Sequence, residues 1–276
     1  MKKIFTIFSA LIIFSVILTG CGENKPAPAE VKIGMIRHLN ASEEEFNNFT
    51  KKVADTFSIR LTTYNPVFYD NLQSMILALD SGEVGVISTY DCVAKYLVAK
   101  NPKYKIMIDD TLEFIDAFCF LMRSEDVELK DSVNNALLEM NNDGTLERLT
   151  KTYITNAKAD DPPAVEISHI DGAETLKVAV TGDLPPLDLV LADGNSAGFN
   201  TALIAELGKR LNKNIELMDI DSAARASALT SGRADIIFWA IVPVSEIIPA
   251  DADIPAGTII SSPYYRARIT HVKLKN

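Results

Sequence analysis

The sequence predicts an α/β protein, and two observations carry that prediction. Residues 174–265 alternate short apolar segments with amphipathic segments across short loops, the pattern of a parallel sheet covered by helices. Residues 31–115 show the same alternation. A chain of 276 residues, 47% of them hydrophobic, is long enough for one large domain or two modest domains with buried cores.

The C-terminal alternation contains three expected strands, Leu176–Val180, Ile215–Met218 and Ile236–Ile241. An amphipathic helix is expected to follow Gly198 and to end near Leu211, and a shorter helix should end at Leu229-Thr-Ser-Gly232. Both helices fall between strands, as a sheet with covering helices requires.

The N-terminal alternation begins with a strand over Val31–Ile36. A helix should then start at Ser42, because Ser is a good N-cap and three Glu residues follow it. The elements expected after it are strands over 58–63, 86–89, 106–108 and 118–122 and helices over 69–79, 93–98 and 128–140.

The first twenty residues predict a lipoprotein signal peptide. Met1-Lys-Lys3 is a basic start, and the apolar run Ile4–Ile17 is short for a membrane span. Leu18-Thr-Gly-Cys21 has the lipobox pattern, in which cleavage leaves an acylated Cys at the N-terminus. Residues 21–30 would then form a flexible tether, and a lipid on Cys21 would hold the protein at the membrane surface.

Composition excludes several classes of function. The net charge is −10 with no basic stripe, so nucleic acid is a poor partner. The histidines His38, His169 and His271 are scattered, so we expect no metal and no cofactor. No convergent nucleophile, acid and base set is found, so we expect no enzyme.

Two cysteines remain after Cys21, namely Cys92 and Cys119. The sequence favours two buried free thiols over a disulfide, although the distance between them decides the matter. The carboxylates Asp183, Asp188 and Asp221 are expected to be solvated loop residues.

Two sets of motifs resemble the type II periplasmic solute-binding proteins, in particular the polar amino-acid-binding family 3 of ABC importers. The first set includes Asp183-Leu-Pro-Pro-Leu187, Gly198-Phe-Asn200, Leu229-Thr-Ser-Gly-Arg-Ala-Asp235 and Ser262-Pro-Tyr-Tyr265, in the order found in the first lobe. The second set, over 128–149, resembles the family's C-terminal signature. The resemblance implies a two-lobed fold, each lobe a central sheet flanked by helices.

The order of the parts is inverted relative to the family, in which the first lobe opens the chain. Here the expected parts are a second-lobe domain (31–115), the return strand and C-terminal helices of the first lobe (116–155), a linker (156–173), a first-lobe domain (174–265) and a hinge strand with tail (266–276). We therefore predict a circular permutation. Two unrelated half-domains, or lobes exchanged between two chains, are the alternatives.

The resemblance implies where a ligand would lie, but the family's anchors for an amino acid are replaced. The Arg that would hold an α-carboxylate falls on Ile247, and the Asp that would hold the ammonium falls on Tyr90, beside Asp91. At six further positions the family has a hydroxyl, small or aromatic residue, and this chain has Val242, Val244, Trp239, Ala240, Leu184 and Leu187. The Asp of the family's Gly-Phe-Asp corresponds to Asn200.

The expected cleft is therefore apolar, and an amino-acid zwitterion would lose its charge partners there. The candidate ligand-binding residues are Trp239, Tyr90, Asp91, Leu184, Leu187, Val242, Asn40, Ser42 and Arg37. Asn40 and Ser42 belong to an expected helix N-terminus, which binds anions through backbone N–H groups. For Trp239, core packing and ligand contact are equally favoured, and for Arg37 a surface role is the simpler alternative.

These observations predict a lipid-anchored, extracytoplasmic solute-binding protein at the outer face of the cytoplasmic membrane or in the periplasm. Its partners would be a small apolar or aromatic ligand, an ABC permease and, through Cys21, the membrane. The alternative is a sensor or interaction lipoprotein that transports nothing and whose cleft is filled by its own side chains.

Overall fold

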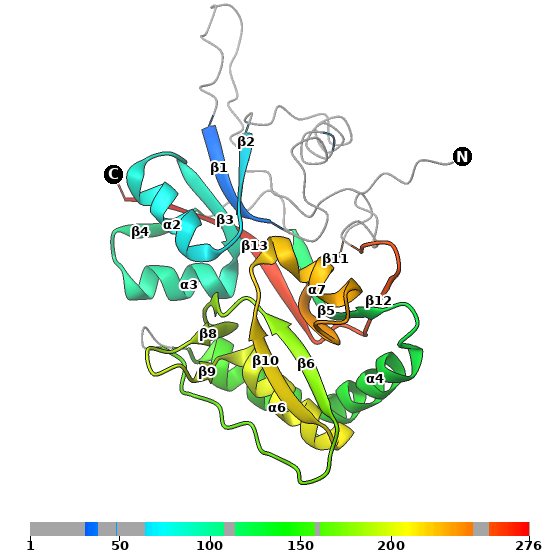
Figure 1. The fold of residues 1–276 in the computed structure, drawn as a ribbon. Helices are drawn as coiled ribbons and strands as arrows, with labels where there is room; N and C mark the ends of the chain where they lie inside the picture. The colour runs from blue at the N-terminus through cyan, green and yellow to red at the C-terminus, as the bar shows by residue number, and fades with distance from the viewer. Residues whose placement is uncertain are drawn as a thin grey trace, which may run out of the picture.

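The computed structural model describes residues 31–37, 48, 64–107, 114–157, 161–244 and 254–275 (Figure 1). Strands and helices are interspersed throughout this part of the chain, so the predicted α/β class is confirmed. The expected helix after Ser42 and the expected strand over 58–63 lie outside the described residues.

The N-terminal half, residues 31–107, is a sheet with helices α2 and α3 packed against it (Figure 1). Its elements are β1 (Val31–Ile36), β2 (Tyr64–Tyr69), α2 (Leu72–Ser81), β3 (Val86–Tyr90), α3 (Asp91–Lys100) and β4 (Tyr104–Met107). The side chain of Asn71 caps α2 by accepting a hydrogen bond of 2.9 Å from the backbone N–H of Ser74.

The sequence analysis did not predict strand β2, whose sequence contains a proline. Pro66 has no N–H to donate to a neighbouring strand, a property that argues against a central strand. In the structure β2 is an edge strand, which pairs only with β1 among the described strands, so the missing N–H of Pro66 is tolerated. Tyr69, expected to begin a helix, instead ends this strand.

The C-terminal half, residues 114–268, carries the remaining strands and helices. Its elements are β5 (Ile115–Arg123), α4 (Val127–Asn142), α5 (Thr145–Thr150), the π-helix η1 (Lys151–Thr155), β6 (Thr175–Val180), β7 (Asp183–Leu184), β8 (Asp188–Val190), β9 (Ser196–Ala197), α6 (Phe199–Leu211), β10 (Asn214–Asp219), the 3-10 turn η2 (Ser222–Ala224), α7 (Arg225–Thr230), β11 (Ile236–Pro243), β12 (Thr258–Ile260) and the start of β13 (Tyr265–Leu274).

Strand β13 belongs to both halves. Residues Tyr265–Arg268 pair antiparallel with β5, whereas Ile269–Leu274 pair with β3 and β4. The main sheet therefore runs in the order β10-β6-β11-β5-β13-β3-β1-β2, with a separate small sheet of β7, β8 and β9. The pairs of β6 with β10 and β11, and of β1 with β2 and β3, are parallel, as expected for a helix-covered sheet.

The hydrophobic core is continuous across the two halves. One cluster of buried side chains includes Ile87 and Val93 from the N-terminal half together with Phe118, Leu203 and Phe238 from the C-terminal half. Because the same cluster reaches both, separating the halves would expose apolar surface to water, which is unfavourable.

Helix α6 begins against the backbone of the Pro-Pro-Leu segment. The N–H groups of Phe199 and Asn200 donate to the carbonyl oxygens of Pro186 (3.0 Å) and Leu187 (2.7 Å). Gly198, just before the helix, has φ of 103°, and a Cβ there would lie 2.6 Å from the oxygen of Leu187. Only glycine fits this position without displacing the backbone that caps the helix.

We predict that Gly198→Ala lowers the free energy of unfolding by more than about 2 kcal/mol, because it adds a clash to an unfavourable φ. Urea denaturation measures the change. Gly194→Ala is the matched control, since Gly194 has φ of 84° but no atom within 4 Å of the added Cβ. The control should lower the free energy of unfolding by about 1 kcal/mol. Equal decreases for both variants would contradict the argument that the added Cβ clashes with the Leu187 backbone.

Candidate functional site

Tyr90 and Trp239, predicted from different segments to line a cleft, meet at the junction of the two halves. Their ring centroids lie 5.8 Å apart in an edge-to-face arrangement, and the ring of Phe118 contacts both. Such aromatic pairs add stability beyond the area that they bury. Tyr90 is 4% exposed and Trp239 is 3% exposed, so in this conformation the two rings fill the space between the halves themselves.

Trp239 lies at an irregular point of β11. The pairing of β11 with β5 shifts register between Ile237 and Ala240, and Trp239 has φ of 67°, a left-handed value that is costly for a bulky residue. Its backbone N–H donates to the Tyr264 hydroxyl at 3.2 Å, so a side chain takes the place of a ladder partner. The bulge thereby turns the indole toward Tyr90.

The Tyr90 hydroxyl donates to a carboxylate that sequence reasoning missed. Asp116, on β5, accepts this hydrogen bond at Oδ2 over 3.0 Å and is 1% exposed. Tyr90 also ends β3 and precedes the first residue of α3. One side chain therefore joins the end of a strand in the N-terminal half to the strand that begins the C-terminal half.

The other predicted apolar residues are divided between two clusters. Leu184 and Leu187 are buried and belong to the same core cluster as Tyr90 and Trp239. Val242 is partly buried and packs against a different cluster, which includes Ala240. Val244 is 50% exposed, and Ile247 lies outside the described residues. The structure thus brings four of the predicted apolar residues into one cluster and leaves Val242 apart.

The predicted polar residues have partners within their own half. Asp91, the first residue of α3, accepts from Lys95 at 2.8 Å, and Arg37 pairs with Asp70 at 3.2 Å and lies over the Phe68 ring. Asn40 and Ser42 lie outside the described residues.

Arg225, at the start of α7, is a buried cation that the sequence analysis did not single out. It is 1% exposed, its Nη1 donates to the Phe238 carbonyl oxygen at 2.8 Å, and its guanidinium carbon lies 5.1 Å from the centroid of the Trp239 ring. The contact is a cation–π interaction beneath the indole. The available signal was its spacing, because Arg225 shares a helix face with the buried residues Ala228 and Leu229.

Asp188 is not the solvated loop residue that the sequence led us to expect. It is 2% exposed and accepts from the Thr181 hydroxyl (2.6 Å), the Gly182 N–H (2.6 Å) and the Asn200 amide (2.8 Å). Burial raises the pKa of this carboxyl, whereas those hydrogen bonds and the Arg225 charge lower it. Asn200 is thus an amide donor to a buried carboxylate.

Asp183 links the two halves directly. Its Oδ2 accepts from the backbone N–H of Gln73 at 3.2 Å, in the first turn of α2, and the N–H of Ser222 donates to the Asp70 carbonyl oxygen at 3.2 Å. Burial, together with the neighbouring Asp188 and Asp221 carboxylates, raises the pKa of Asp183 to about 6, and the hydrogen bonds from α2 oppose that rise. Of the three carboxylates expected to be solvated, only Asp221 is exposed.

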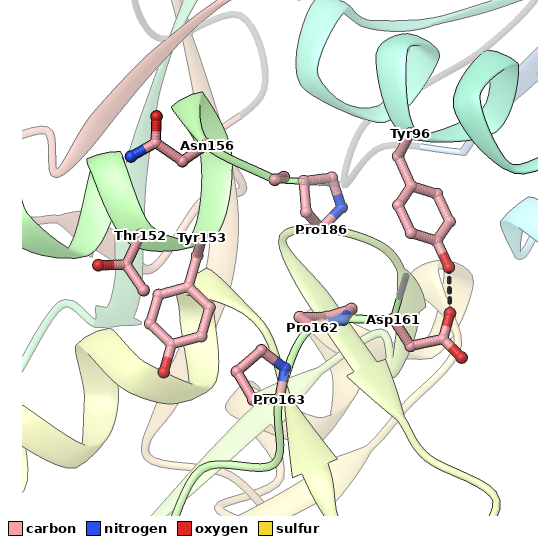
Figure 2. Close-up of a pocket in the computed structure, with 9 residues that line it drawn as sticks. Tyr96, Thr152, Tyr153, Asn156, Asp161, Pro162, Pro163 and Pro186 are labelled. Atoms are coloured by element: carbon pink, nitrogen blue, oxygen red, sulfur yellow. Dashed lines mark hydrogen bonds between the residues drawn. The ribbon is translucent and has the colours of Figure 1, made fainter. Parts of the chain in front are cut away.

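A hollow of about 210 Å³ lies beside the linker, and neither Tyr90 nor Trp239 lines it (Figure 2). We call it the linker pocket, and its lining residues are Tyr96, Thr152, Tyr153, Asn156, Ala157, Asp161, Pro162, Pro163 and Pro186. They come from α3, from η1 and the residues after it, from the linker and from the Pro-Pro segment. No signal in the sequence grouped these segments, because only the tertiary structure brings them together.

Cys92 and Cys119 are buried free thiols, as the sequence favoured. Burial raises the pKa of each thiol to about 12, so neither is a reactive thiolate at neutral pH. In the described part of the chain, no cluster of three or more potential metal ligands is found. Over the same residues, none of the helices has the length and apolarity that a membrane span needs.

Comparison with known proteins supports the family resemblance over part of the chain. Residues 176–246 match the sequence model of the bacterial extracellular solute-binding proteins, family 3, which confirms the predicted resemblance for that segment. A search of curated proteins finds no match.

Several solved structures are similar to the chain at low sequence identity. The GluR0 ligand-binding core in complex with L-glutamate is 10% identical, with 91% of this chain and 87% of that chain covered and a TM-score of 0.43. An ABC-transporter periplasmic substrate-binding protein from Coxiella burnetii is 14% identical (88% and 84% covered, TM-score 0.43). The regulatory domain of HypT from Salmonella typhimurium, bound to bromide, is 8% identical (92% and 90% covered, TM-score 0.40).

We predict that Asp183→Asn flattens the pH dependence of stability between pH 4 and pH 7. The folded pKa of about 6 lies above the usual 3.8, so the stability that Asp183 contributes is full below about pH 4 and is lost as pH rises through 6. An Asn keeps an acceptor for the Gln73 N–H but carries no charge to bury. The variant should therefore melt at a higher temperature than the parent at pH 7.

Thermal melts at half-unit pH intervals test this prediction, with the exposed and distant-in-sequence carboxylate variant Glu166→Gln as the control. The control should keep the slope of the parent protein. A slope that is unchanged in Asp183→Asn would show that Asp183 is not the group that titrates in this range.

Proposed function

We propose, from the family match over residues 176–246, that the protein is an extracytoplasmic solute-binding protein that serves an ABC importer and is anchored by a lipid on Cys21. The observation that carries this proposal is the meeting of Tyr90 and Trp239 at the junction of two halves that share strand β13. In two-lobed binding proteins the ligand enters such a junction and lobe closure traps it. The role is binding and not catalysis.

The ligand that this junction favours is small and apolar or aromatic. Tyr90, Trp239 and Phe118 pack their rings together at the junction, with Leu184 and Leu187 in the same cluster, so separation of the halves would present apolar and aromatic surface to a ligand. The buried charges nearby already have hydrogen-bond partners. Asp188 accepts hydrogen bonds from three donors, and Arg225 donates one to the Phe238 carbonyl oxygen. A zwitterionic amino acid would bring two further charges into this setting at a cost of several kcal/mol.

A second candidate function is a sensor or interaction lipoprotein that transports nothing. The burial of Tyr90 and Trp239 favours it, because the two rings already occupy the junction, and so does the contact between Asp183 and α2. In that case the closed conformation is the functional one, and a partner protein takes the place of the permease.

A circular permutation of the family fold accounts for the order of the elements. The segment that matches the family model, residues 176–246, follows the linker, and β13 crosses to the N-terminal half. The backbone N–H of Lys275, just after β13, donates to the Lys103 carbonyl oxygen, and β13 and β1 lie in the same sheet on either side of β3. In the unpermuted family fold, the segments that correspond to Leu274 and Val31 would be continuous. A permutation with its break between these two residues fits the position of β13 and β1 in one sheet.

A thermal-melt screen of the chain from Gly22 onward separates the two functions. A ligand at about a hundred times its dissociation constant adds roughly 2.7 kcal/mol and raises the melting temperature by several degrees. We expect a neutral aromatic compound to give such a shift and free amino acids to give none. A strong shift with an amino acid would contradict the proposed ligand class, and no shift with any compound would favour the sensor.

We predict that Trp239→Ala abolishes the shift given by the compound found in the screen, while costing about 3–5 kcal/mol of stability through the lost indole packing. Phe238→Ala is the matched control, because Phe238 is 1% exposed and packs against Phe120 and Tyr264 but makes no ring contact with Tyr90 among the described pairs. The control should be destabilised yet keep the ligand-induced shift. Loss of the shift in both variants would contradict a specific contact with Trp239.

We predict that Cys21→Ser prevents lipidation and releases the protein into the soluble extracytoplasmic fraction, because the thiol of Cys21 is the acylation site of the lipobox. Labelling of expressing bacteria with a fatty-acid probe measures lipid incorporation. Cys92→Ser, which alters a buried thiol, is the control and should remain labelled. Incorporation that persists in Cys21→Ser would refute the anchor.

A further inference from the structure

We propose that the linker pocket is a second binding site, which takes a small uncharged aromatic molecule. It is separate from the proposed junction site, since neither Tyr90 nor Trp239 lines it. Its volume of about 210 Å³ lies below the range of roughly 300–1,000 Å³ typical for drug-sized ligands, so a molecule with a single ring is the appropriate size.

The walls of the linker pocket contain several rings. Tyr96 and Tyr153 supply two aromatic rings, and Pro162, Pro163 and Pro186 supply three pyrrolidine rings (Figure 2). Aromatic ligands pack well against such rigid surfaces, because neither proline nor tyrosine loses much conformational freedom on binding. Burial raises the pKa of the Tyr153 phenol, so that ring stays uncharged at neutral pH.

The polar groups of the pocket exclude an anion. Its lining includes no Lys, Arg or His, and its one charged residue is Asp161. The Oδ1 atom of Asp161 accepts from the Tyr96 hydroxyl and, at 2.7 Å, from Lys100. A carboxylate or phosphate would therefore find no counter-charge on the walls. The Asn156 amide can exchange hydrogen bonds with a ligand hydroxyl, and the Thr152 hydroxyl, which donates to the Arg148 carbonyl oxygen at 2.8 Å, can accept one.

An irregular helix shapes one wall of the pocket. Residues Lys151–Thr155 form a π-helix, in which the N–H of Asn156 donates to the Lys151 carbonyl oxygen at 2.9 Å. The π form is less stable than an α-helix and occurs frequently at functional sites. Here it places Thr152, Tyr153 and Asn156 together on the wall opposite Tyr96 (Figure 2).

Because of the position of the pocket, a bound molecule would contact both halves of the protein. Tyr96 lies on α3 in the N-terminal half, whereas Tyr153 and Pro186 lie in the C-terminal half. The linker crosses between them, held to α3 by Asp161 and to β9 by the hydrogen bond from the Val165 N–H to the Ser196 carbonyl oxygen (3.0 Å). A molecule in the pocket would contact all three segments and so stabilise the joined arrangement of the halves.

Saturation-transfer NMR with p-cresol tests the proposal on the chain from Gly22, which retains every described element. p-Cresol is a neutral ring with one hydroxyl, and 4-hydroxyphenylacetate is its anionic counterpart. We expect transfer to p-cresol and little or none to 4-hydroxyphenylacetate. Equal transfer to both compounds, or none to p-cresol, would overturn the proposal.

Two variants locate the binding. Ala157→Phe fills the pocket from an exposed position and should abolish transfer to p-cresol with no loss of melting temperature. Tyr153→Ala removes a ring from the wall and should weaken binding even if Ala157→Phe fails to fold. Ala256→Phe, an exposed alanine that does not line the pocket, is the matched control and should bind as the parent does. Transfer that persists in both pocket variants would place p-cresol elsewhere and overturn the proposal.

Discussion

The rest of the structure depends on the hydrogen bonding of strand β13. One end of the strand completes the sheet of the C-terminal half through β5, and the other end completes the sheet of the N-terminal half through β3 and β4. At the change of partner, the N–H of Ile269 donates to the Phe114 carbonyl oxygen at 2.9 Å. Relative motion of the halves must therefore bend the backbone near Arg268 and Ile269, where hinge residues of a domain closure would absorb it.

The junction of the halves combines an apolar interior with a few buried charges. Tyr90, Phe118 and Trp239 pack edge to face, while Arg225 lies beneath the indole and Asp188 is enclosed by three hydrogen-bond donors. Burial of these ions is tolerated because each has specific partners, and loss of a partner would leave an uncompensated charge. The amide of Asn200 follows the same logic, since an acidic side chain at that position would be repelled by Asp188.

The linker adds a further connection between the halves, besides β13, the aromatic junction and the hydrogen bond of Asp183 to α2. Asp161 bonds Tyr96 and Lys100 on α3, and Ala164 forms a β-bridge with Ala197 on β9. A connecting segment fixed at both sides costs conformational entropy, which its hydrogen bonds and proline packing offset. The same crossing creates the hollow beside it, so the restraint and the linker pocket have one structural origin.

The sequence by itself determined the α/β class, most of the regular elements and the family resemblance of residues 176–246, because apolar periodicity and turn residues are local signals. It also predicted that Tyr90 and Trp239 line one cleft. Only the tertiary structure decided that their rings meet, that Asp188 and Arg225 are buried, and that β2 tolerates Pro66 at the end of the sheet. These features depend on contacts between residues distant in the chain, whose burial and pairing no local pattern encodes.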